Sequence, residues 1–368
     1  MFQKFTTSIN AWFNKTLVSL LNYSSNREWD RLLKSSLAPY TSKSSNDIAI
    51  CGLIQTQYKT LREVVGESTD NQAIKLQQQL FTTAVKTIIN TTVTLSNIVG
   101  VQALSAPVGL VYTMRYDKPT PTIGGDNNQL NTIRLQVLSN TIVANTRRLG
   151  VHMPLYTKPA EIELEGEIST AIANEIGCNM VDMVINDLHS IATTRTAFQL
   201  EDHWSVRDAT RLSISINQAC NKIAELTRRA AGNFIIASPT ILTTLVQLPG
   251  YARASMDSWN TTGLCLAGIL NETIRVYTSF NTNLTNDILV GYVGTVGATD
   301  TGYIYAPYVT LLSSGVVMDA LTFEPTLPLL TRFGTSSNGA GREPFTNGNY
   351  YAVITVAQPL LETTTATN

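Results

Sequence analysis

One long stripe of apolar residues restricts the fold of this chain more than any other feature of its sequence. The stripe follows the spacing of three and four residues that marks one face of a helix: Ile168, Ile172, Ile176, Met180, Met183, Val184, Leu188 and Ile191. Before it stand Glu161, Glu163, Glu165 and Glu167, and negative charge at a helix start is favoured by the helix dipole. A helix of about 26 residues is a rod of about 40 Å. Such a rod is long for a globular domain and fits poorly in an isolated molecule.

The first hundred residues also show helical periodicity. A first helix is indicated by Phe2, Phe5, Ile9, Trp12, Phe13, Leu17, Leu20 and Leu21. Asp47 stands where it could cap a second helix, whose apolar residues are Ile50, Leu53, Ile54, Leu61 and Val65. A third helix is indicated by Ala73, Leu76, Leu80, Ala84 and Ile88.

The polar face of the first helix indicates whether the helix packs on a membrane or on a protein. That face holds only Lys4 and Lys15, whereas helices that lie on a membrane surface usually carry more positive charge. We therefore expect this helix to pack on another protein rather than on a membrane. Its aromatic residues are candidate subunit contacts: Phe2, Phe5, Trp12 and Phe13.

From Val93 onward, apolar runs broken by glycine and proline indicate strands. Residues Tyr116–Gln129 are dense in turn-forming residues and predict a loop tip. Alternating apolar residues from Ile133 to Val137 predict a strand, and we expect a return strand over Thr141–Arg148. The two would form a projecting arm, which is too thin to hold a core of its own.

A compact α/β region is expected to follow the long helix. A helix with the apolar residues Ile216, Ala219, Cys220, Ile223, Leu226 and Ala230 is predicted to stop at Gly232, a suitable C′ residue. GNFIIAS then reads as a buried strand. Ser238 is a predicted N-cap with Pro239 at the first helical position, and this helix is expected to end at Pro249. Short strands are predicted over residues 263 to 312 and again at Val353–Val356.

The composition of the chain indicates a surface with a low free-energy cost of desolvation. Hydrophobic residues make up 43% of the chain and charged residues only 14%, against about 25% in an ordinary soluble protein. Neutral polar residues such as threonine and asparagine replace the charges, which suits a protein covered by its neighbours. A β-rich protein explains the threonine equally well. The formal net charge of −1 argues against a dedicated nucleic-acid binder.

Features that reveal a cellular compartment favour a cytosolic product without a membrane segment. The four cysteines are widely scattered, as expected of small buried residues in a reducing compartment: Cys51, Cys178, Cys220 and Cys265. The first residues, which begin with Met1, lack the apolar core of a signal peptide. No window of the sequence reaches the length of an apolar membrane span.

Motifs that would carry chemistry are missing from the sequence. Three histidines, with no HExxH and no cysteine/histidine cluster, predict neither a catalytic site nor a metal site. The glutamates before the long helix could bind a cation, but a solvated helix start explains them better. GTVGATDTG, residues 294 to 302, has the wrong glycine spacing for a phosphate loop and is followed by strand-like residues. No GxSxG is present. We therefore expect no enzyme activity and no cofactor.

Concentrations of arginine stand at Arg147-Arg148, at Arg228-Arg229 and at Arg332. Helix ends and solvated faces account for each of them singly. Contacts to carboxylates of a neighbouring molecule account for them as well, because the arginine fork binds a carboxylate with two hydrogen bonds. Both interpretations stay open at this point.

The segment SNIVGVQALSAPVGLVYTMRY resembles the major capsid proteins of tailed bacteriophages, particularly the T-even-like myovirus branch. That family has the motif Val-Gln-Pro-x-Ser-x-Pro-x-Gly-Leu-x-x-x-x-Arg. Ala103 replaces its first proline, and the matching residues are Gln102, Ser105, Pro107, Gly109, Leu110 and Arg115.

Four further stretches resemble the family in its own order. GNFIIASP (232 to 239) is similar to a strand-to-helix junction, and ILVGYVG (288 to 294) to a Leu-Val-Gly-Tyr strand. DTGYIYAPYVTLL (300 to 312) is similar to a Gly-x-x-Tyr-Ala-Pro-Tyr segment, and FEPTLPLLTRFG (323 to 334) to a stretch that ends in Thr-Arg-Tyr-Gly. The resemblance covers roughly residues 95 to 357.

The resemblance implies an α+β fold of the Hong Kong 97 capsid type. Its parts would divide the chain into a helical N-terminal arm (1 to 100), an entry strand with an extended loop hairpin (101 to 160), a peripheral-domain spine helix (161 to 204), an axial domain (205 to 312) and a return to the peripheral domain with a C-terminal tail (313 to 368). The extended loop is too short for the inserted domain of T-even-like relatives. T-even-like capsid proteins also lose an N-terminal propeptide to a phage protease that cuts after Leu-x-Glu or Ile-x-Glu, a pattern that Leu61-Arg62-Glu63 fits. Some relatives crosslink a lysine to an asparagine, and Lys118 stands in the loop. We expect neither reaction here.

The function that the resemblance implies is self-assembly, as hexamers and pentamers, into an icosahedral head that encloses phage DNA. Scaffolding, portal and decoration proteins would be its partners, DNA would lie near it without specific binding, and the chain would belong to the virion after synthesis in the cytoplasm of a bacterial host. Candidate subunit contacts beyond the first helix are Arg115, Lys118, Arg134, Arg147, Arg148, Arg228 and Arg229. Alternatives are a vertex or minor capsid paralogue, an encapsulin-like compartment shell and, more distantly, a β-rich hydrolase or glycan-binding protein.

Overall fold

The structure of the chain is a computed structural model. It describes residues 27–40, 45–66, 71–117, 134–152, 162–199, 206–254, 263–280, 284–294, 299–313, 317–318, 325–338 and 346–357. The predicted first helix, with Phe2, Phe5, Trp12 and Phe13, lies outside the described residues, and so does Lys118.

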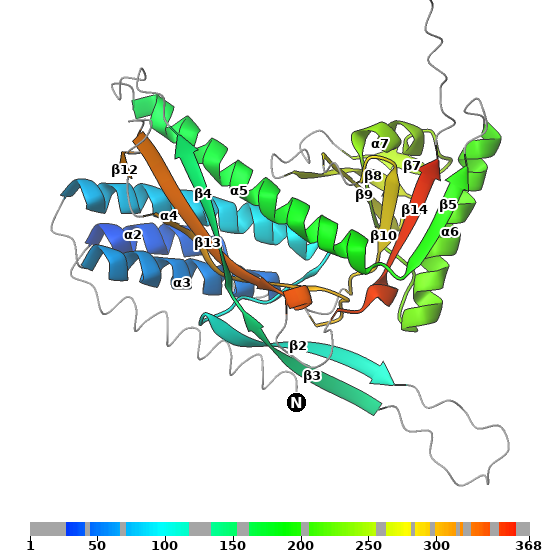
Figure 1. Cartoon of the computed structure of the whole chain (residues 1–368), viewed down its shortest axis with the longest axis horizontal. Coiled ribbons are helices and arrows are strands. Elements are labelled where there is room, and N and C mark those ends of the chain that lie inside the picture. Colours follow the sequence, from blue (N-terminus) through cyan, green and yellow to red (C-terminus); the bar gives the residue numbers. More distant parts are fainter. Residues whose placement is uncertain are drawn as a thin grey trace, which may run out of the picture.

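The described part combines helices with three sheets, which agrees with the expected α+β class (Figure 1). Its α-helices are α2 (Arg27–Leu37), α3 (Ser45–Gly66), α4 (Asn71–Ser96), α5 (Ile162–Ile191), α6 (Val206–Thr227) and α7 (Pro239–Leu245), and its 3-10 helices are η3 (Ser336–Asn338) and η4 (Gly348–Tyr350). Its strands are β1 (Gly100–Val101), β2 (Val108–Asp117), β3 (Arg134–Val143), β4 (Asn145–His152), β5 (Thr194–Gln199), β6 (Phe234–Ala237), β7 (Tyr251–Arg253), β8 (Leu264–Leu270), β9 (Ile274–Ser279), β10 (Asp287–Gly291), β11 (Ile304–Ser313), β12 (Val317–Met318), β13 (Pro325–Thr335) and β14 (Tyr351–Ala357).

Helices α2, α3 and α4 form a layer that packs on the body of the same chain. Their shared core includes Leu33, Ile54, Tyr58 and Phe81, and the last two rings meet edge to face with centroids 6.0 Å apart. Both α3 and α4 contact β11, and α4 also contacts α5. The described part of the predicted arm therefore lies on its own molecule. Asp47 is in the first turn of α3 rather than at its cap, because the helix begins two residues earlier at Ser45.

A five-stranded sheet carries this helical layer. Its order is β1-β11-β13-β12, and β4 pairs with β13 as well. Gln57 of α3 reaches this sheet, and its side-chain oxygen accepts hydrogen bonds from the backbone N–H groups of Thr310 (3.1 Å) and Leu311 (3.4 Å). Its side-chain amide donates to the Leu311 carbonyl. Gln57 is fully buried, so this paired amide fixes the layer to β11 without leaving its polar atoms unsatisfied.

The projecting arm exists, but its strands differ from those predicted. β2 pairs antiparallel with β3 from Val108↔Val143 to Asp117↔Arg134, and Figure 1 shows this hairpin extending away from the body. The predicted return strand over Thr141–Arg148 is wrong. The chain instead passes from the end of β3 into β4, which pairs with β13 in the five-stranded sheet. Strand pairing is a contact between distant residues, and local alternation does not reveal the partner.

Helix α5 is the predicted long rod, and it spans 30 residues. The predicted stripe is buried at Ile176, Met180, Val184 and Leu188. Val181 and Ile185 are buried too, because one core that includes residues of both large sheets surrounds the helix. Figure 1 shows α5 running along the molecule from the five-stranded sheet to the second large sheet.

The second large sheet has seven strands in the order β5-β14-β10-β6-β9-β8-β7. It is covered on both faces, as successive residues of β6 show: Phe234 and Ile236 belong to the core around α5, whereas Ile235 and Ala237 belong to the core under α6 and α7. β14 lies in this sheet and β11 in the five-stranded sheet. The predicted boundary near residue 312 would instead place β11 with the strands of the seven-stranded sheet, and β14 apart from them. The division of the chain into five parts stays a prediction.

The three helix ends predicted in this region have different outcomes. The end predicted at Pro249 is wrong, because α7 ends at Leu245. Ser238 caps α7 as predicted, with its side chain accepting from the Ile241 N–H and Pro239 in the first turn. The predicted stop of α6 at Gly232 is wrong, because α6 ends at Thr227. Arg228 there takes the left-handed conformation, with φ of 53°, a role that usually falls to glycine.

Candidate subunit interface

The hairpin of β2 and β3 presents one bare apolar face. Val108, Leu110 and Tyr112 on β2 are 52%, 56% and 45% exposed, and Val137 and Val143 on β3 are 58% and 39% exposed. The register places these side chains on the same face, because Val108 is opposite Val143 and Tyr112 is two residues before the partner of Val137. We call these five residues the bare face of the hairpin. An exposed apolar patch of this kind is typical of an interaction site, which makes the bare face the candidate interface.

The opposite face of the hairpin is buried at its root. Val111 and Ile142 are fully buried, and Thr113 is 6% exposed. Val111 and Ile142 pack with Leu104 and with Ile304 and Ala306 of β11 in a small core. Of the two faces of the root, this one packs on the body, and the other has no covering layer among the described residues.

The sequence motif before β2 explains how the root is seated. A Cβ at Gly109 would lie 2.6 Å from Cδ2 of Leu104, so glycine lets β2 pass directly over that leucine. The Pro107 carbonyl accepts a hydrogen bond from the Ala144 N–H at 2.8 Å, and this bond closes the base of the hairpin. The Pro and Gly of the motif thus set the chain reversal between the five-stranded sheet and the hairpin.

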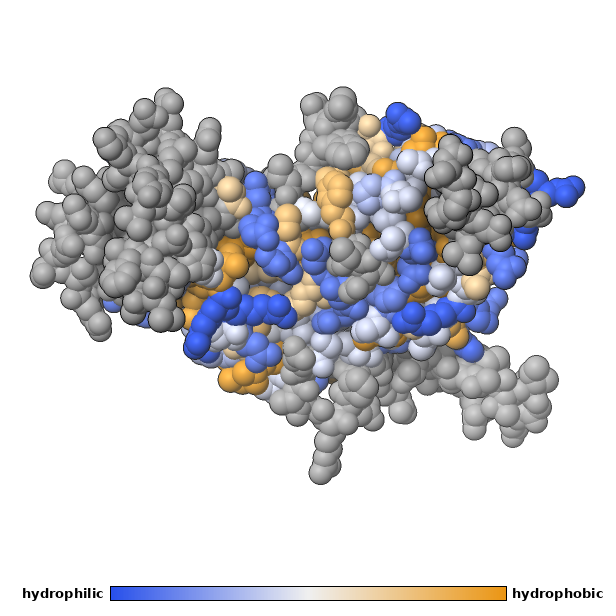
Figure 2. Space-filling model, turned by 45° about the horizontal axis from the view of Figure 1, so that its top comes forward, coloured by the Kyte–Doolittle hydropathy of each residue, from blue (hydrophilic) through white to orange (hydrophobic). Residues whose placement is uncertain are grey.

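Other exposed apolar side chains are scattered. Of the ten large apolar residues that are exposed in the described part of the chain, five form the bare face. The remaining five are one or two to a segment, on α4, α6, β8 and the residue after β9: Val93, Ile214, Leu226, Ile269 and Phe280. Figure 2 shows one face of the molecule, on which apolar and polar residues are interspersed. The clustering on the hairpin therefore distinguishes it from the rest of the surface.

Arg147 and Arg148 stand on β4 at the edge of the five-stranded sheet. Nη2 of Arg147 donates to Sδ of Met183 at 2.9 Å, and its guanidinium lies 5.7 Å from the centre of the Phe333 ring. Neither arginine forms an ion pair within the part of the chain that the structure describes. Both side chains are exposed, and Arg147 is oriented by its contacts. Their role as subunit contacts stays a prediction.

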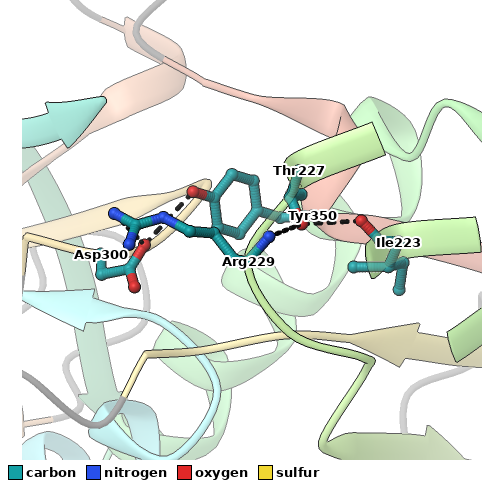
Figure 3. A network of polar contacts seen from close by, with 5 residues as sticks. All are labelled: Ile223, Thr227, Arg229, Asp300 and Tyr350. Atoms are coloured by element: carbon teal, nitrogen blue, oxygen red, sulfur yellow. Dashed lines mark hydrogen bonds and ion pairs between the residues drawn. The ribbon is translucent and has the colours of Figure 1, made fainter. Parts of the chain in front are cut away.

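Arg229 forms an ion pair within its own chain. Its guanidinium lies 3.5 Å from the Asp300 carboxylate, to which the Tyr350 hydroxyl also donates at 3.3 Å (Figure 3). Burial, and then the neighbouring Asp300 charge, raise the pKa of Tyr350 to about 12. The Arg229 N–H donates to Thr227 Oγ1, which donates to the Ile223 carbonyl, so the same residue also closes the end of α6. Arg228, exposed in its left-handed conformation, stands beside this network.

Arg115 and Arg134 lie on the hairpin itself, near the end of the described strands. Their backbones pair with Gln136 and Asp117 respectively, whereas their side chains lie outside the described atoms. Sequence reasoning thus selected charged residues of the hairpin, and their role as subunit contacts stays a prediction. It missed the bare face, because residues 108 to 112 are mostly apolar and show no clean alternation, and only the position of the root over Leu104 decides which side chains are covered.

Side chains that could take part in catalysis are hydrogen-bonded or buried within the described part of the chain. His189 Nε2 lies 2.6 Å from the Asp287 carboxylate, and the Asp187 carboxylate accepts from the hydroxyls of Tyr303 (2.5 Å) and Ser337 (2.9 Å). Burial raises the pKa of Cys51 to about 11 and that of Cys220 to about 12, so both thiols stay protonated. Among the described residues, no three histidine, cysteine or acidic side chains come together as a metal site.

Within the described ranges, no helix combines the length and the apolar character that crossing a bilayer requires.

Comparison with known proteins connects this geometry to a family. The model of the family "Major capsid protein Gp23" matches residues 119–356. The major capsid protein of Vibrio phage KVP40 is 26% identical over 246 residues, which cover 58% of this chain and 47% of that protein. The major capsid protein of Enterobacteria phage T4 is 26% identical over 245 residues, which cover 58% and 46%. The chain therefore spans about half the length of the curated relatives that it matches.

Similar solved structures include one of Mycobacterium phage Bobi, with a TM-score of 0.44 and 12% identity over 72% of this chain and 90% of that one. The capsid of the Myoviridae phage XM1 gives a TM-score of 0.38 and 11% identity over 70% and 90%. These scores are too low to add to the argument. The family model covers well over half of the chain, and the helices and sheets of the described residues agree with the expected α+β class. The chain belongs to the Gp23 family of major capsid proteins.

Proposed function

We propose that this chain is a major capsid protein that assembles through contacts between identical subunits, as hexamers and pentamers, into an icosahedral shell around packaged DNA. The observation that carries the proposal is the bare face of the hairpin, seen in a member of a capsid protein family. The site of assembly is then the hairpin, and its occupant is the surface of a second copy.

The bare face of the hairpin has no covering layer among the described residues. A two-stranded ribbon is marginal in water without a partner for its apolar face, and burying one large apolar side chain contributes about 1.5 to 3 kcal/mol. The five residues of the bare face supply such a term at one contact. A shell repeats this contact in every subunit, and the closed lattice turns modest contacts into collective stability through effective concentration.

The remaining parts of the proposal follow from composition and chemistry. A net charge of −1 favours a wall that does not hold DNA tightly. We infer a structural role without enzyme activity or cofactor, a place in the virion after synthesis in the bacterial cytoplasm, and contacts with scaffolding, portal and decoration proteins. Because the chain spans about half of its curated relatives, these partners are proposals for this chain.

The test is to express the chain and to image the products by electron microscopy, with the double variant Leu110→Lys and Val137→Lys beside it. Both side chains are more than half exposed, so the substitutions leave the fold intact. Ile214→Lys is the matched control, because Ile214 is 51% exposed on α6. We expect closed shells from the wild type and the control, and folded unassembled subunits from the double variant.

Two results would contradict the proposal. One is a wild-type chain that stays monomeric in all salt and scaffold conditions, and the other is a double variant that assembles as well as the wild type. The copy number of the chain in purified virions separates a major capsid protein from a vertex or minor paralogue. Terminase and portal genes beside its gene, rather than a cargo enzyme, separate a phage head from a compartment shell.

A further inference from the structure

The segment before the hairpin runs beside β11 as a parallel strand. The backbone N–H groups of Gly100, Gln102 and Leu104 donate to the carbonyls of Tyr303 (3.1 Å), Tyr305 (3.0 Å) and Pro307 (2.8 Å) respectively. Alternate residues of the segment are thereby fixed to the five-stranded sheet. The backbone of Gln102 is in the middle of this row, so its position is set by the body of the molecule.

The side chain of Gln102 binds the hairpin. Its Nε2 donates to the Tyr112 carbonyl at 2.7 Å, and its Oε1 accepts from the Tyr112 N–H at 3.0 Å. One side-chain amide thus makes with Tyr112 both of the hydrogen bonds that a residue of a neighbouring antiparallel strand makes. No shorter side chain and no charged one offers a donor and an acceptor at this reach.

These two bonds lie on the edge of β2 that faces away from β3. In an antiparallel pair a residue directs its N–H and its carbonyl to the same side, and successive residues alternate. The N–H and the carbonyl of Tyr112 both bind the side chain of Gln102. On the same edge, the Met114 N–H donates to the Thr299 carbonyl at 3.1 Å. Val111 and Thr113 therefore direct theirs to β3. The outer edge of β2 is held by the body at two successive positions.

A second contact from the same segment acts on the face of the hairpin. Leu104, two residues after Gln102, lies against Gly109 so closely that a Cβ there would be 2.6 Å from Cδ2 of the leucine. Gln102 thus holds the edge of β2 and Leu104 supports its face. An edge contact and a face contact together fix a ribbon in both directions in which it can swing.

We propose that Gln102 is a positioning residue that joins the five-stranded sheet to the hairpin as a one-residue third strand, and that it thereby sets the angle at which the bare face meets a second copy. This inference rests on the proposed function for its effect on assembly. Its local part, the hold on Tyr112, is independent of assembly.

The test compares two variants of Gln102 with a matched control. Gln102→Met keeps the length of the side chain and removes both hydrogen bonds. Gln102→Glu keeps the acceptor and removes the donor. Gln218→Met makes the first change at an exposed position on α6. Each protein is measured by residue-resolved hydrogen–deuterium exchange, by thermal melting and by electron microscopy of its assembled products.

We expect exchange at the Tyr112 amide of the unassembled subunit to rise by roughly threefold to tenfold in Gln102→Met, because a hydrogen bond contributes about 0.5 to 1.5 kcal/mol. Exchange at the Val111 amide, which is bonded to β3, stays unchanged. Gln102→Met then yields malformed or open shells although its melting temperature falls by only about 2 to 4 °C. Gln102→Glu falls between it and the wild type, and Gln218→Met matches the wild type.

The inference is overturned if exchange at Tyr112 is unchanged in Gln102→Met, or if that variant forms closed shells of normal diameter and yield although exchange rises. It is overturned as well if assembly fails in proportion to a lowered melting temperature, which is the mark of a merely structural role. A wild type that forms no shells contradicts the proposed function instead, and exchange at Tyr112 then still decides whether Gln102 holds the hairpin.

Discussion

The seven-stranded sheet and the hairpin use similar residues in opposite ways. Strand β6 of the sheet is covered on both faces, by α5 on one side and by α6 and α7 on the other. The hairpin is covered on one face, at its root, and leaves Leu110 and Val137 bare. Apolar side chains in the sheet stabilise the subunit, whereas those of the hairpin's bare face have no covering layer among the described residues. We propose that the first region serves folding and the second serves assembly.

The largest expected effect tests the folding side of this comparison. Ile236 is fully buried in β6, so Ile236→Ala should lower the free energy of unfolding by about 2 to 5 kcal/mol. Val137→Ala, on the bare face, should change it by less than about 0.5 kcal/mol. Denaturant unfolding of the unassembled subunit measures both. Equal losses at the two positions would remove the contrast.

The next effect concerns the polar network that joins η4 to the residues before β11. Tyr350 has a pKa raised from 10.0 to about 12 by burial and then by Asp300. A raised folded-state pKa contributes stability that is complete below pH 10 and is lost as the pH rises through 12. About two pKa units correspond to roughly 2 to 3 kcal/mol.

Unfolding measured between pH 9 and pH 12 (roughly the window of these two pKa values) tests this sign. The wild type should lose stability across it, and Tyr350→Phe should lose less, because phenylalanine has no proton to give up. A variant whose loss equals that of the wild type would show that the Tyr350 hydroxyl is not the group concerned.

The smallest effect tests the seat of the hairpin. Gly109→Ala places a methyl group against Leu104, and we expect a cost of about 1 kcal/mol because the leucine side chain can move aside. In a Leu104→Ala background the same change should cost nearly nothing. A double-mutant cycle measures this coupling, and additive costs would mean that Leu104 does not support the hairpin at that point.

Local signals allowed a large part of the fold to be predicted. The stripe of α5 and the Ser238-Pro239 start of α7 depend on residues close in sequence, and both are confirmed. The pairing of β2 with β3, and of β14 with β10, depends on contacts between distant residues. The end of α6 was wrong because Arg228 takes a backbone conformation that favours glycine.

The candidate interface was predicted as a region but not as a set of residues. The strand predicted from Ile133 to Val137 overlaps β3 of the arm, whereas the loop tip predicted at Tyr116–Gln129 lies mostly outside the described residues. The choice among the side chains followed charge. Which face of β2 is bare depends on Leu104 and on the neighbouring residues of β11. The sequence of residues 108 to 112 does not indicate that contact. The role of Gln102 likewise depends on a contact with a residue outside its own segment, Tyr112.

The most direct test of the account asks whether the bare face is covered on assembly. Cysteine is placed at Leu110 and, as a control, at Ile214, and its reaction with a maleimide is followed at each site by peptide mass spectrometry, which separates it from the native Cys178. The account predicts that both cysteines react in the free subunit and that position 110 loses most of its reactivity in the shell, whereas position 214 keeps it. A cysteine at position 110 that reacts equally fast in free subunits and in closed shells would contradict the account.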